Sequence, residues 1–432
     1  MAKFCYLWPI ISAKSTNMKK LYKRIISVFI AAILAYSAAF AQSDSLMTVS
    51  GIVRDQGQRL PFVSVTIEGS TLGTITNEDG YFSLKIPRTD KEITIVISHV
   101  GYYATSSTLK ASDAHDMRII LNPYSDLLQE AYVIGHDPET LVEEALRKIR
   151  LNYPMAPVAQ RGFYRETAKK GSRYISVSEA VLDMYKYSYS TSAEFDRVRV
   201  LKGRRLMSQK SSDTLSVKLQ GGPNLAMKLD AVKNQQDLFF KEDLPTYNYV
   251  MEDPTVIEER PVYVISMVPR IRNNRYALYN AKVFIDKESL AIMRCEWSTD
   301  MSDPDLVTSA ILKKKPAGMR FAPQDVSFIA SYRLVDGKAV LHYVRGAMEF
   351  KCDWKKRLFS STYAIVTEMV ATDVRMNDVL PVLSRETFRD TDNFYDRVDD
   401  FADPDFWGDY NILEPSESLE HAVERLRRRA RQ

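Results

Sequence analysis

The chain has 432 residues, of which 45% are hydrophobic and 26% charged, a composition typical of a folded globular protein. Its formal net charge of +4 comes from the first 41 residues, which carry six basic and no acidic side chains. The rest of the chain has 53 basic and 55 acidic residues, a near balance that lacks the basic excess typical of nucleic-acid-binding proteins. We therefore expect no nucleic-acid partner.

Residues 1–41 have the order of a secretory signal peptide. Four closely spaced basic residues precede an apolar run, Ile25–Ala39, and a small-x-small motif that ends at Ala41. We expect cleavage between Ala41 and Gln42, and Met18 is an alternative natural start. The apolar run is short for a membrane span and no cysteine follows it at the cleavage point, so we expect neither a transmembrane span nor a lipid anchor after cleavage. The expected location is the periplasm or the outer membrane, with secretion as an alternative.

Residues 46–122 alternate between apolar and polar side chains in short runs that turn residues separate. The runs are Val49–Arg54, Val63–Ile67, Leu72–Thr76, Tyr81–Ile86, Glu92–His99 and Met117–Leu121. Several short strands with this spacing predict an antiparallel β-sandwich. Asn77–Gly80 is expected to form a hairpin turn, because Gly80 can adopt a positive φ.

Four blocks of this domain, in order, resemble the carboxypeptidase regulatory-like domain: Gly51–Asp55, Leu60–Val65, Gly73–Phe82 and His99–Tyr102. Asn77 stands where that family usually has Asp, a conservative difference. The resemblance implies a seven-stranded transthyretin-like sandwich, an accessory module of exported Bacteroidota proteins that often precedes the plug of TonB-dependent outer-membrane receptors. The remaining chain is too short for a plug and a large barrel, so we do not expect a receptor.

Residues 123–157 are expected to form a linker and a helix. His136-Asp137-Pro138-Glu139 has the HxxE spelling of zinc carboxypeptidases. The same residues suit a helix start, with Asp137 as the N-cap and Pro138 at the first helical position. The next histidine, His342, lies far along the chain, so helix capping is the favoured interpretation and we expect no metal.

Residues 158–375 are mostly strand-like and predict a long antiparallel meander, curled or closed into a half-barrel and packed on a helix. The predicted strands are Val262–Val268, Ala281–Asp286, Leu290–Trp297, Val326–Val335 and Ala339–Phe350. Asp336-Gly337 is a strong two-residue turn signal, and the packing helix is expected between Leu225 and Phe240. The fold class is therefore mostly β, with two β-rich domains and few helices.

Several phrases of this domain resemble an uncharacterised exported Bacteroidota family that accompanies the first module: Arg161–Glu166, Ser178–Ala180, Gly221–Pro223 and Val283–Asp286. The order of strands and helix is also similar, more weakly, to open half-barrels that carry lipoproteins or lipids. That second resemblance implies an apolar cavity on the concave face.

Three tyrosines, Tyr185, Tyr187 and Tyr189, alternate with polar residues and are expected to share one strand face. Exposed, they could bind a partner by stacking on sugars; the alternative is a buried face. Gly221-Gly222-Pro223 could hold an anion at a helix start, although a plain turn is the favoured interpretation.

Cys295 and Cys352 are the cysteines expected to remain after signal cleavage. Alternation places both on apolar strand faces, so we expect buried thiols. Two packed free cysteines are favoured, and a disulfide between them is the alternative.

Residues 376–432 form a C-terminal extension. Aspartates and aromatic residues interleave over residues 399–409 without the spacing of a calcium loop, so docked aromatics and solvated carboxylates are favoured over a metal site. Ser416–Gln432 predicts a terminal helix with Leu419, Val423 and Leu426 on its apolar face and arginines near its end, where they suit the helix dipole.

No nucleophile, base and oxyanion donors can be assembled from the sequence, so we expect no catalytic residue, no cofactor and no enzymatic activity. The expected function is that of an exported cell-envelope protein that binds or assembles with a protein or glycan partner. The alternative is a periplasmic carrier that holds a lipid or lipoprotein in a cavity of the second domain, and a hydrolase is a remote alternative.

Overall fold

A computed structural model describes residues 46–110, 114–124, 137–208, 219–270, 275–312, 318–355, 360–403 and 408–430. Strands dominate these residues, which confirms the mostly β fold class. None of the helices in the described part of the chain is long and apolar enough to cross a membrane. The predicted cleavage point and the linker that contains His136 lie outside the described residues.

The first domain has seven strands in two sheets, ordered β4-β1-β7 and β3-β2-β5-β6. Their bounds are β1 Leu46–Arg54, β2 Ser64–Ile67, β3 Gly73–Ile75, β4 Tyr81–Pro87, β5 Glu92–Ser98, β6 Thr105–Lys110 and β7 Met117–Ile120. The predicted sandwich is confirmed, but not its purely antiparallel pairing, because β1 and β7 pair in parallel. Strand β6 was not predicted, since this edge strand is polar and has no apolar alternation for the sequence to show.

The predicted hairpin at Asn77–Gly80 is wrong, because β3 and β4 belong to different sheets. The local turn chemistry was predicted correctly. Gly80 has a φ of 70°, and Asn77 Oδ1 accepts hydrogen bonds from the backbone amides of Asp79 and Tyr81 at 2.9 and 3.0 Å. A turn signal therefore determines the local backbone conformation, whereas the sheets that the two strands join depend on packing.

The sandwich core is filled by the apolar side chains that alternate along its strands. Fully buried examples are Val53, Val65, Phe82, Leu84, Ile95 and Ile97. These residues lie at the positions that period-two patterning assigns to the inner faces.

Two helices, α2 (Pro138–Arg147) and α3 (Ile149–Asn152), precede the second domain. Asp137 caps α2 by accepting hydrogen bonds from the amide and the hydroxyl of Thr140 at 2.9 and 2.8 Å. The predicted capping role of Asp137 is confirmed, with Pro138 at the helix start.

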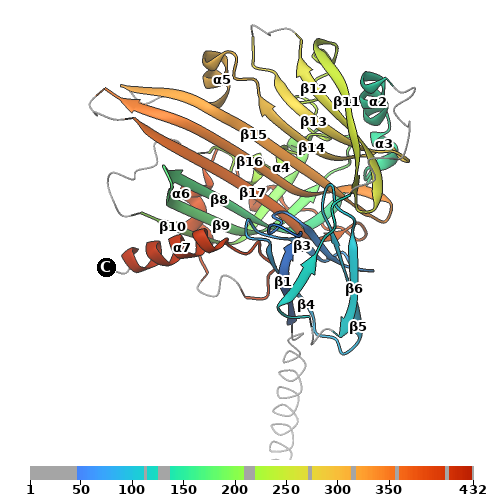
Figure 1. Cartoon of the computed structure of the whole chain (residues 1–432). Coiled ribbons are helices and arrows are strands. Elements are labelled where there is room, and N and C mark those ends of the chain that lie inside the picture. Colours follow the sequence, from blue (N-terminus) through green and yellow to red (C-terminus); the bar gives the residue numbers. More distant parts are fainter. Residues whose placement is uncertain are drawn as a thin grey trace, which may run out of the picture. The chain divides into compact units, whose positions relative to one another are not determined.

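The second domain is built on one ten-stranded antiparallel sheet ordered β10-β9-β8-β17-β16-β15-β14-β13-β12-β11 (Figure 1). The bounds are β8 Val158–Lys170, β9 Arg173–Lys186, β10 Arg197–Met207, β11 Tyr247–Ile257, β12 Arg260–Pro269, β13 Tyr279–Asp286, β14 Ile292–Thr299, β15 Met319–Val335, β16 Lys338–Trp354 and β17 Ser361–Arg375. Two meanders, β8 to β10 and β11 to β17, meet where β17 pairs with β8. The sheet is open, because β10 and β11 lie at its two edges.

The turn between β15 and β16 confirms the strongest local signal of the second domain. Asp336 and Gly337 have φ values of 49° and 74°, the positive values that a type I′ turn requires. Val335 and Lys338 then face each other as the last pair of the two long strands.

Helix α4 (Pro223–Lys228) is much shorter than the predicted helix between Leu225 and Phe240. Turns replace the helix from Leu229 onward, because the side chain of Asp230 enters the interior and binds partners on other elements. The predicted apolar positions Val232 and Leu238 are nevertheless buried. Burial was therefore predicted correctly and the extent of the helix was not.

The remaining helical elements cover the sheet and its edges. They are η2 Ala193–Phe195, η4 Leu244–Thr246, α5 Pro304–Ile311, η5 Ser384–Glu386, α6 Phe394–Arg397, η6 Val398–Phe401 and α7 Glu417–Ala430. The predicted terminal helix is α7, whose residues Leu419, Val423 and Leu426 pack on Tyr174 and Val177 of β9. This confirms its amphipathic character.

Candidate functional site

A cavity of about 640 Å³ lies against one face of the large sheet, within the second domain. Most of its lining side chains are apolar. The lining residues are Leu219, Gln220, Gly221, Leu225, Lys228, Leu229, Ala310, Ile311, Leu312, Val326, Phe328, Gly346, Ala347, Met348, Ile365, Thr367, Asp390, Thr391 and Asn393. The volume falls within the roughly 300–1,000 Å³ typical of small-molecule sites.

The floor of the cavity is a contiguous patch on β15, β16 and β17. Phe328, Gly346 and Thr367 face one another across the three strands. One step along the same face, Val326, Met348 and Ile365 form a second row by the same pairing. Period-two alternation puts both rows on one side of the sheet, which explains how three strands supply a continuous apolar surface.

Gly346 lies at the centre of the floor. A Cβ atom at this position would lie 3.1 Å from Thr367 Cγ2 and 3.3 Å from Leu229 Cδ1, closer than most Cβ contacts. Because residue 346 has no side chain, the two rows of floor residues can lie close to the segment that contains Leu229. Space also remains beside these rows. Glycine inside a strand often marks such a place.

Two helical segments supply the other walls. Leu225 and Leu229 come from α4 and the residue after it, and Ala310 and Ile311 come from α5. Leu225 is 37% exposed, a high value for a leucine, and it lies at the solvent edge of the cavity. The cavity is therefore bounded by apolar side chains of the sheet, of α4 and of α5.

Apart from Thr367 on the floor, the polar lining residues come from two segments that are hydrogen-bonded to each other. The Gly221 amide donates to the Asp392 carbonyl at 2.9 Å, and Gln220 Nε2 donates to the Thr391 carbonyl at 3.1 Å. Lys228 Nζ lies 3.2 Å from Asp390 Oδ2 and 2.9 Å from Glu194 Oε2. Partial burial would lower the pKa of Lys228, but the hydrogen bonds to the two carboxylates raise it above its ordinary value.

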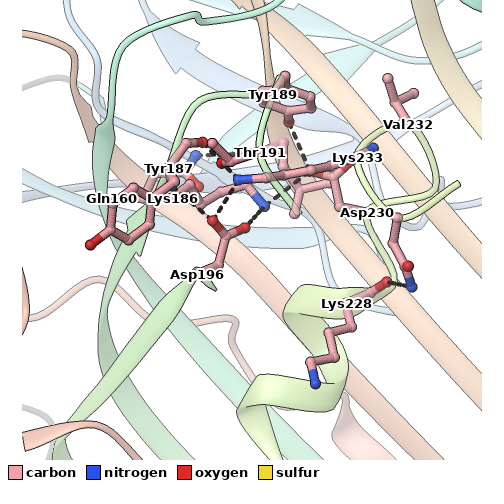
Figure 2. A network of polar contacts seen from close by, with 12 residues as sticks. Gln160, Lys186, Tyr187, Tyr189, Thr191, Asp196, Lys228, Asp230, Val232 and Lys233 are labelled. Atoms are coloured by element: carbon pink, nitrogen blue, oxygen red, sulfur yellow. Dashed lines mark hydrogen bonds and ion pairs between the residues drawn. The ribbon is translucent and has the colours of Figure 1, made fainter. Parts of the chain in front are cut away.

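The segment after α4 is held in place by a buried group of charged and phenolic side chains, which we call the polar clamp (Figure 2). Asp230 directly follows the cavity residue Leu229 and is completely buried. Its carboxylate accepts hydrogen bonds from the hydroxyls of Tyr332 and Tyr189 at 2.7 and 2.8 Å. The members of the clamp are Lys186, Tyr189, Asp196, Asp230, Lys233 and Tyr332.

Two lysines balance the two aspartates of the clamp. Lys186 Nζ lies 2.9 Å from Asp230 and 3.3 Å from Asp196. Lys233 Nζ lies 2.5 Å from Asp196 and donates to the Tyr187 carbonyl at 2.7 Å. All four charged side chains are at most 3% exposed, so each needs its partners to offset the loss of hydration.

The ion pairs of the clamp oppose the effect of burial on Asp230 and Lys186. Burial alone would raise the pKa of Asp230, but Lys186 and the two tyrosine hydroxyls hold it below its ordinary value. Burial would likewise lower the pKa of Lys186, and the two aspartates raise it instead. Burial and the nearby Lys186 lower the pKa of Lys233, which the contact with Asp196 opposes. The clamp therefore holds Asp230, the residue after Leu229 of the cavity wall, through ion pairs and hydrogen bonds.

Glu166 on β8 lies beside the cavity floor, directly opposite Thr367 of β17. The Tyr164 hydroxyl donates to its carboxylate at 3.1 Å. Burial raises the pKa of Glu166 to about 7, the Tyr164 hydrogen bond lowers it and nearby Asp396 raises it. Glu166 is thus a buried carboxyl that titrates near neutral pH.

Two of the three tyrosines weighed as a possible partner surface are buried, which agrees with the alternative of a buried face. Tyr185 and Tyr189 are buried, and Tyr189 belongs to the clamp. Tyr187 is half-buried and packs edge-on against Tyr185 with ring centroids 5.0 Å apart. The exposed stacking platform is therefore wrong, and the buried alternative describes these rings.

Cys295 on β14 and Cys352 on β16 are both completely buried, as predicted. Both are free thiols that pack in different hydrophobic clusters, so the alternative disulfide is not formed. Burial raises the pKa of Cys352 to about 11.

Of the residues weighed for a zinc or an anion site, His136 lies outside the described residues, whereas His342, Gly221 and Gly222 are described. His342 on β16 is buried, and burial together with Arg333 lowers its pKa to about 3. No group of three metal-ligating side chains occurs among the described residues. Gly221 and Gly222 have φ values of 90° and 47° and form the turn that opens the short helix α4.

The carboxylates of the acidic stretch in the C-terminal extension are partly solvated, as predicted, with Asp399 and Asp400 62% and 52% exposed, and they also form ion pairs. Asp399 pairs with Arg205, Asp400 pairs with Arg397 at 2.5 Å, and Lys202 lies 2.8 Å from Asp403. Residues 404–407 of this stretch lie outside the described residues.

Neither the clamp nor the cavity was identified as a set of residues in the sequence. One signal was present for each: Asp230 and Lys233 are charged residues within an apolar interval, and Gly346 interrupts a strand pattern. Their partners could not be found from the sequence, because they come from distant strands and from the C-terminal extension.

Comparisons with known proteins identify the first domain. Residues 49–133 match the CarboxypepD_reg-like domain family, and this part of the chain is a domain of that type. TonB-dependent receptor SusC of Bacteroides thetaiotaomicron is 35% identical over 114 residues, 26% of this chain and 10% of the receptor. TonB-dependent receptor P26 of Formosa agariphila is 35% identical over 101 residues, 23% of this chain and 9% of the receptor. The chain thus spans about a tenth of the length of these curated relatives.

Solved structures similar to this chain include a DUF1329 family protein from Desulfovibrio piger and a LolA superfamily protein from Nitrosomonas europaea. The first has a TM-score of 0.24 and 11% identity, and the matched region covers 57% of this chain and 96% of the Desulfovibrio chain. The second has a TM-score of 0.22 and 10% identity, and covers 59% and 99%. At these scores the likeness carries no conclusion about function.

Proposed function

We propose that this protein is a non-catalytic carrier of the cell envelope that holds the acyl chain of a lipid or lipoprotein in the cavity of its second domain. The observation that carries the proposal is the cavity itself, about 640 Å³ in volume and lined mainly by apolar side chains. A filled interior would have removed this function. Export to the periplasm or the outer membrane is part of the proposal and depends on the signal sequence.

Burial of an acyl chain supplies the binding energy. Each methylene group removed from water contributes about 0.8 kcal/mol, so one additional methylene should tighten binding about fourfold until the cavity is full. The polar residues near Lys228 leave one side of the cavity suited to a headgroup. An amphiphile with its chain on the sheet and its headgroup near α4 fits this arrangement.

The protein or glycan partner that the sequence favoured remains a second proposal. The surface that the sequence suggested for such a partner was Tyr185, Tyr187 and Tyr189, and two of these three tyrosines are buried. The cavity is a physical feature of the kind that the carrier alternative required, and we therefore rank the carrier first.

The test uses the mature protein and Met348→Trp, which places a larger side chain on the cavity floor. Mass spectrometry of the purified protein should detect bound lipid, and a neutral fluorescent probe should be displaced by amphiphiles of increasing chain length. Met348→Trp should weaken displacement at least tenfold, because the indole occupies chain volume. The matched control is Met251→Trp, since Met251 is half-buried on the edge strand β11 and does not line the cavity. Equal binding by both variants would contradict the proposal.

The non-catalytic part of the proposal has its own test. The purified mature protein should leave peptide and ester substrates intact over hours at neutral pH. Cleavage that survives repurification and is lost on substitution of a single residue would establish the hydrolase alternative.

A further inference from the structure

The cavity has one cationic lining residue among those described, and that residue is shared by two carboxylates. Lys228 lies at the C-terminal end of α4, 2.9 Å from Glu194 of η2 and 3.2 Å from Asp390 of the C-terminal extension. Lys228 and Asp390 line the cavity. Glu194 is not a lining residue, but it forms an ion pair with Lys228. The three side chains together carry one net negative charge at the polar side of the cavity.

These ion pairs are exposed enough to be exchanged for contacts with a ligand. The side chains of Glu194 and Asp390 are 68% and 53% exposed, and Lys228 is 27% exposed. Ion pairs at such positions contribute little net stability, because water solvates the separated charges well. A ligand can therefore replace one of the contacts at small cost.

We propose that this side of the cavity selects a zwitterionic headgroup, one that carries both a phosphate and an ammonium group, an inference that rests on the proposed acyl-chain carrier function. The phosphate would bind the Lys228 ammonium, and the ligand ammonium would bind the carboxylates of Asp390 and Glu194. Each charged group of the headgroup then contacts a side chain of opposite charge. The ion pairs of Lys228 with Glu194 and Asp390 are replaced by ion pairs with the ligand.

Two other headgroup classes match this group of charges less well. A purely anionic headgroup would compete with two carboxylates for Lys228 and would add negative charge beside three described side chains that together already carry −1. An uncharged headgroup would gain neither contact. The charge pattern therefore ranks zwitterionic amphiphiles above anionic ones that have the same chain.

The test compares two lysophospholipids that share one acyl chain and differ in the headgroup: lysophosphatidylethanolamine and lysophosphatidylglycerol. Displacement of a neutral fluorescent probe from the mature protein should show about fivefold tighter binding of the ethanolamine lipid, which corresponds to about 1 kcal/mol. Free phosphoethanolamine should not displace the probe, because it lacks the chain that supplies the binding energy.

The double variant Asp390→Asn with Glu194→Gln should abolish this preference by removing both contacts to the ligand ammonium. The matched control is Asp392→Asn, since Asp392 is close in sequence but pairs with Arg397 at 2.5 Å and does not line the cavity. The control should keep the preference. Equal loss of preference in the control and the double variant would show a general field effect and would overturn the proposal.

The outcomes separate this inference from the function on which it rests. If both lipids bind equally and Met348→Trp weakens both, the cavity holds the chain and the headgroup inference is wrong. If neither lipid displaces the probe, or Met348→Trp has no effect on displacement, the carrier function itself fails. Tighter binding of the glycerol lipid would reverse the assigned charge preference and would also overturn the inference.

Discussion

The two domains use the same strand chemistry with opposite results. In the sandwich, alternating apolar residues such as Phe82 and Leu84 are fully buried against one another. In the large sheet, the alternating residues of β15, β16 and β17 form the floor of a cavity of about 640 Å³. Since protein interiors are normally close-packed, a cavity of this size has to be held open by other interactions. The difference is that the described core of the first domain is filled, whereas the large sheet of the second domain has open volume against one face.

The polar clamp supplies part of the support that the sandwich does not need. It holds Asp230, next to the cavity wall at Leu229, through Tyr189, Tyr332 and Lys186. A hydrophobic core of equal volume would be at least as stable but would fill the space. The buried charges therefore fix a segment beside a cavity, where apolar packing is incomplete.

The largest effect is expected from Asp230→Ala. Removing this carboxylate leaves Lys186 and two hydroxyls without their partner in the interior, which should lower the free energy of unfolding by about 3–5 kcal/mol. Chemical denaturation followed by circular dichroism measures the change. Asp253→Ala is the control, because Asp253 is exposed on β11, and it should change stability by less than about 0.5 kcal/mol. A small effect of Asp230→Ala would show that the clamp does not support the cavity wall.

Glu166→Gln should have a pH-dependent effect. The raised folded-state pKa, about 7 against 4.5, means that wild-type stability is complete below about pH 4.5 and is lost as the pH rises through 7. Glutamine keeps an acceptor for Tyr164 but has no such loss, so it should stabilise the protein by about 2–3 kcal/mol at pH 8 and hardly at all at pH 4.5. Denaturation midpoints of the wild-type protein and of Glu166→Gln, measured from pH 4.5 to pH 8, test this expectation. Parallel curves for the two proteins would contradict the assignment of a buried carboxyl.

The smallest effect comes from a matched pair that compares the two domains directly. Ile95→Val in the filled sandwich core should cost about 1 kcal/mol. Ile365→Val on the cavity floor should cost less, because one side of that side chain faces open volume and makes fewer contacts. Unfolding free energies of the two variants test this ranking. An equal or larger loss for Ile365→Val would indicate that the floor is packed as tightly as the sandwich.

Much of the fold was predictable because its signals are local. Period-two alternation located six of the seven strands of the first domain and five of the ten strands of the large sheet. The positive φ values at Asp336 and Gly337 follow from residue types that favour such turns. The N-cap at Asp137 is equally local. Where a signal was weak, as for the polar edge strand β6, the prediction missed the element.

The candidate site could not be predicted in the same way. A helix was expected where Asp230 and Lys233 instead turn into the interior, because their partners outweigh local helical preference. The alternation of the tyrosines near residue 187 permits an exposed surface, yet Tyr189 is buried and its hydroxyl donates a hydrogen bond to Asp230. In each case the outcome depended on a residue from another element.

The sequence by itself determined the β-rich class of the fold, the type of the first domain and the composition of the strand faces, because these properties depend on neighbouring residues. Only the tertiary structure decided that three strand faces would enclose a cavity, that Asp230 would be clamped beside it, and that Lys228 would meet Asp390, 162 residues away. The physical reason is that cavities and buried charge networks depend on which distant segments pack together. That choice is made by the whole chain and leaves no local periodicity.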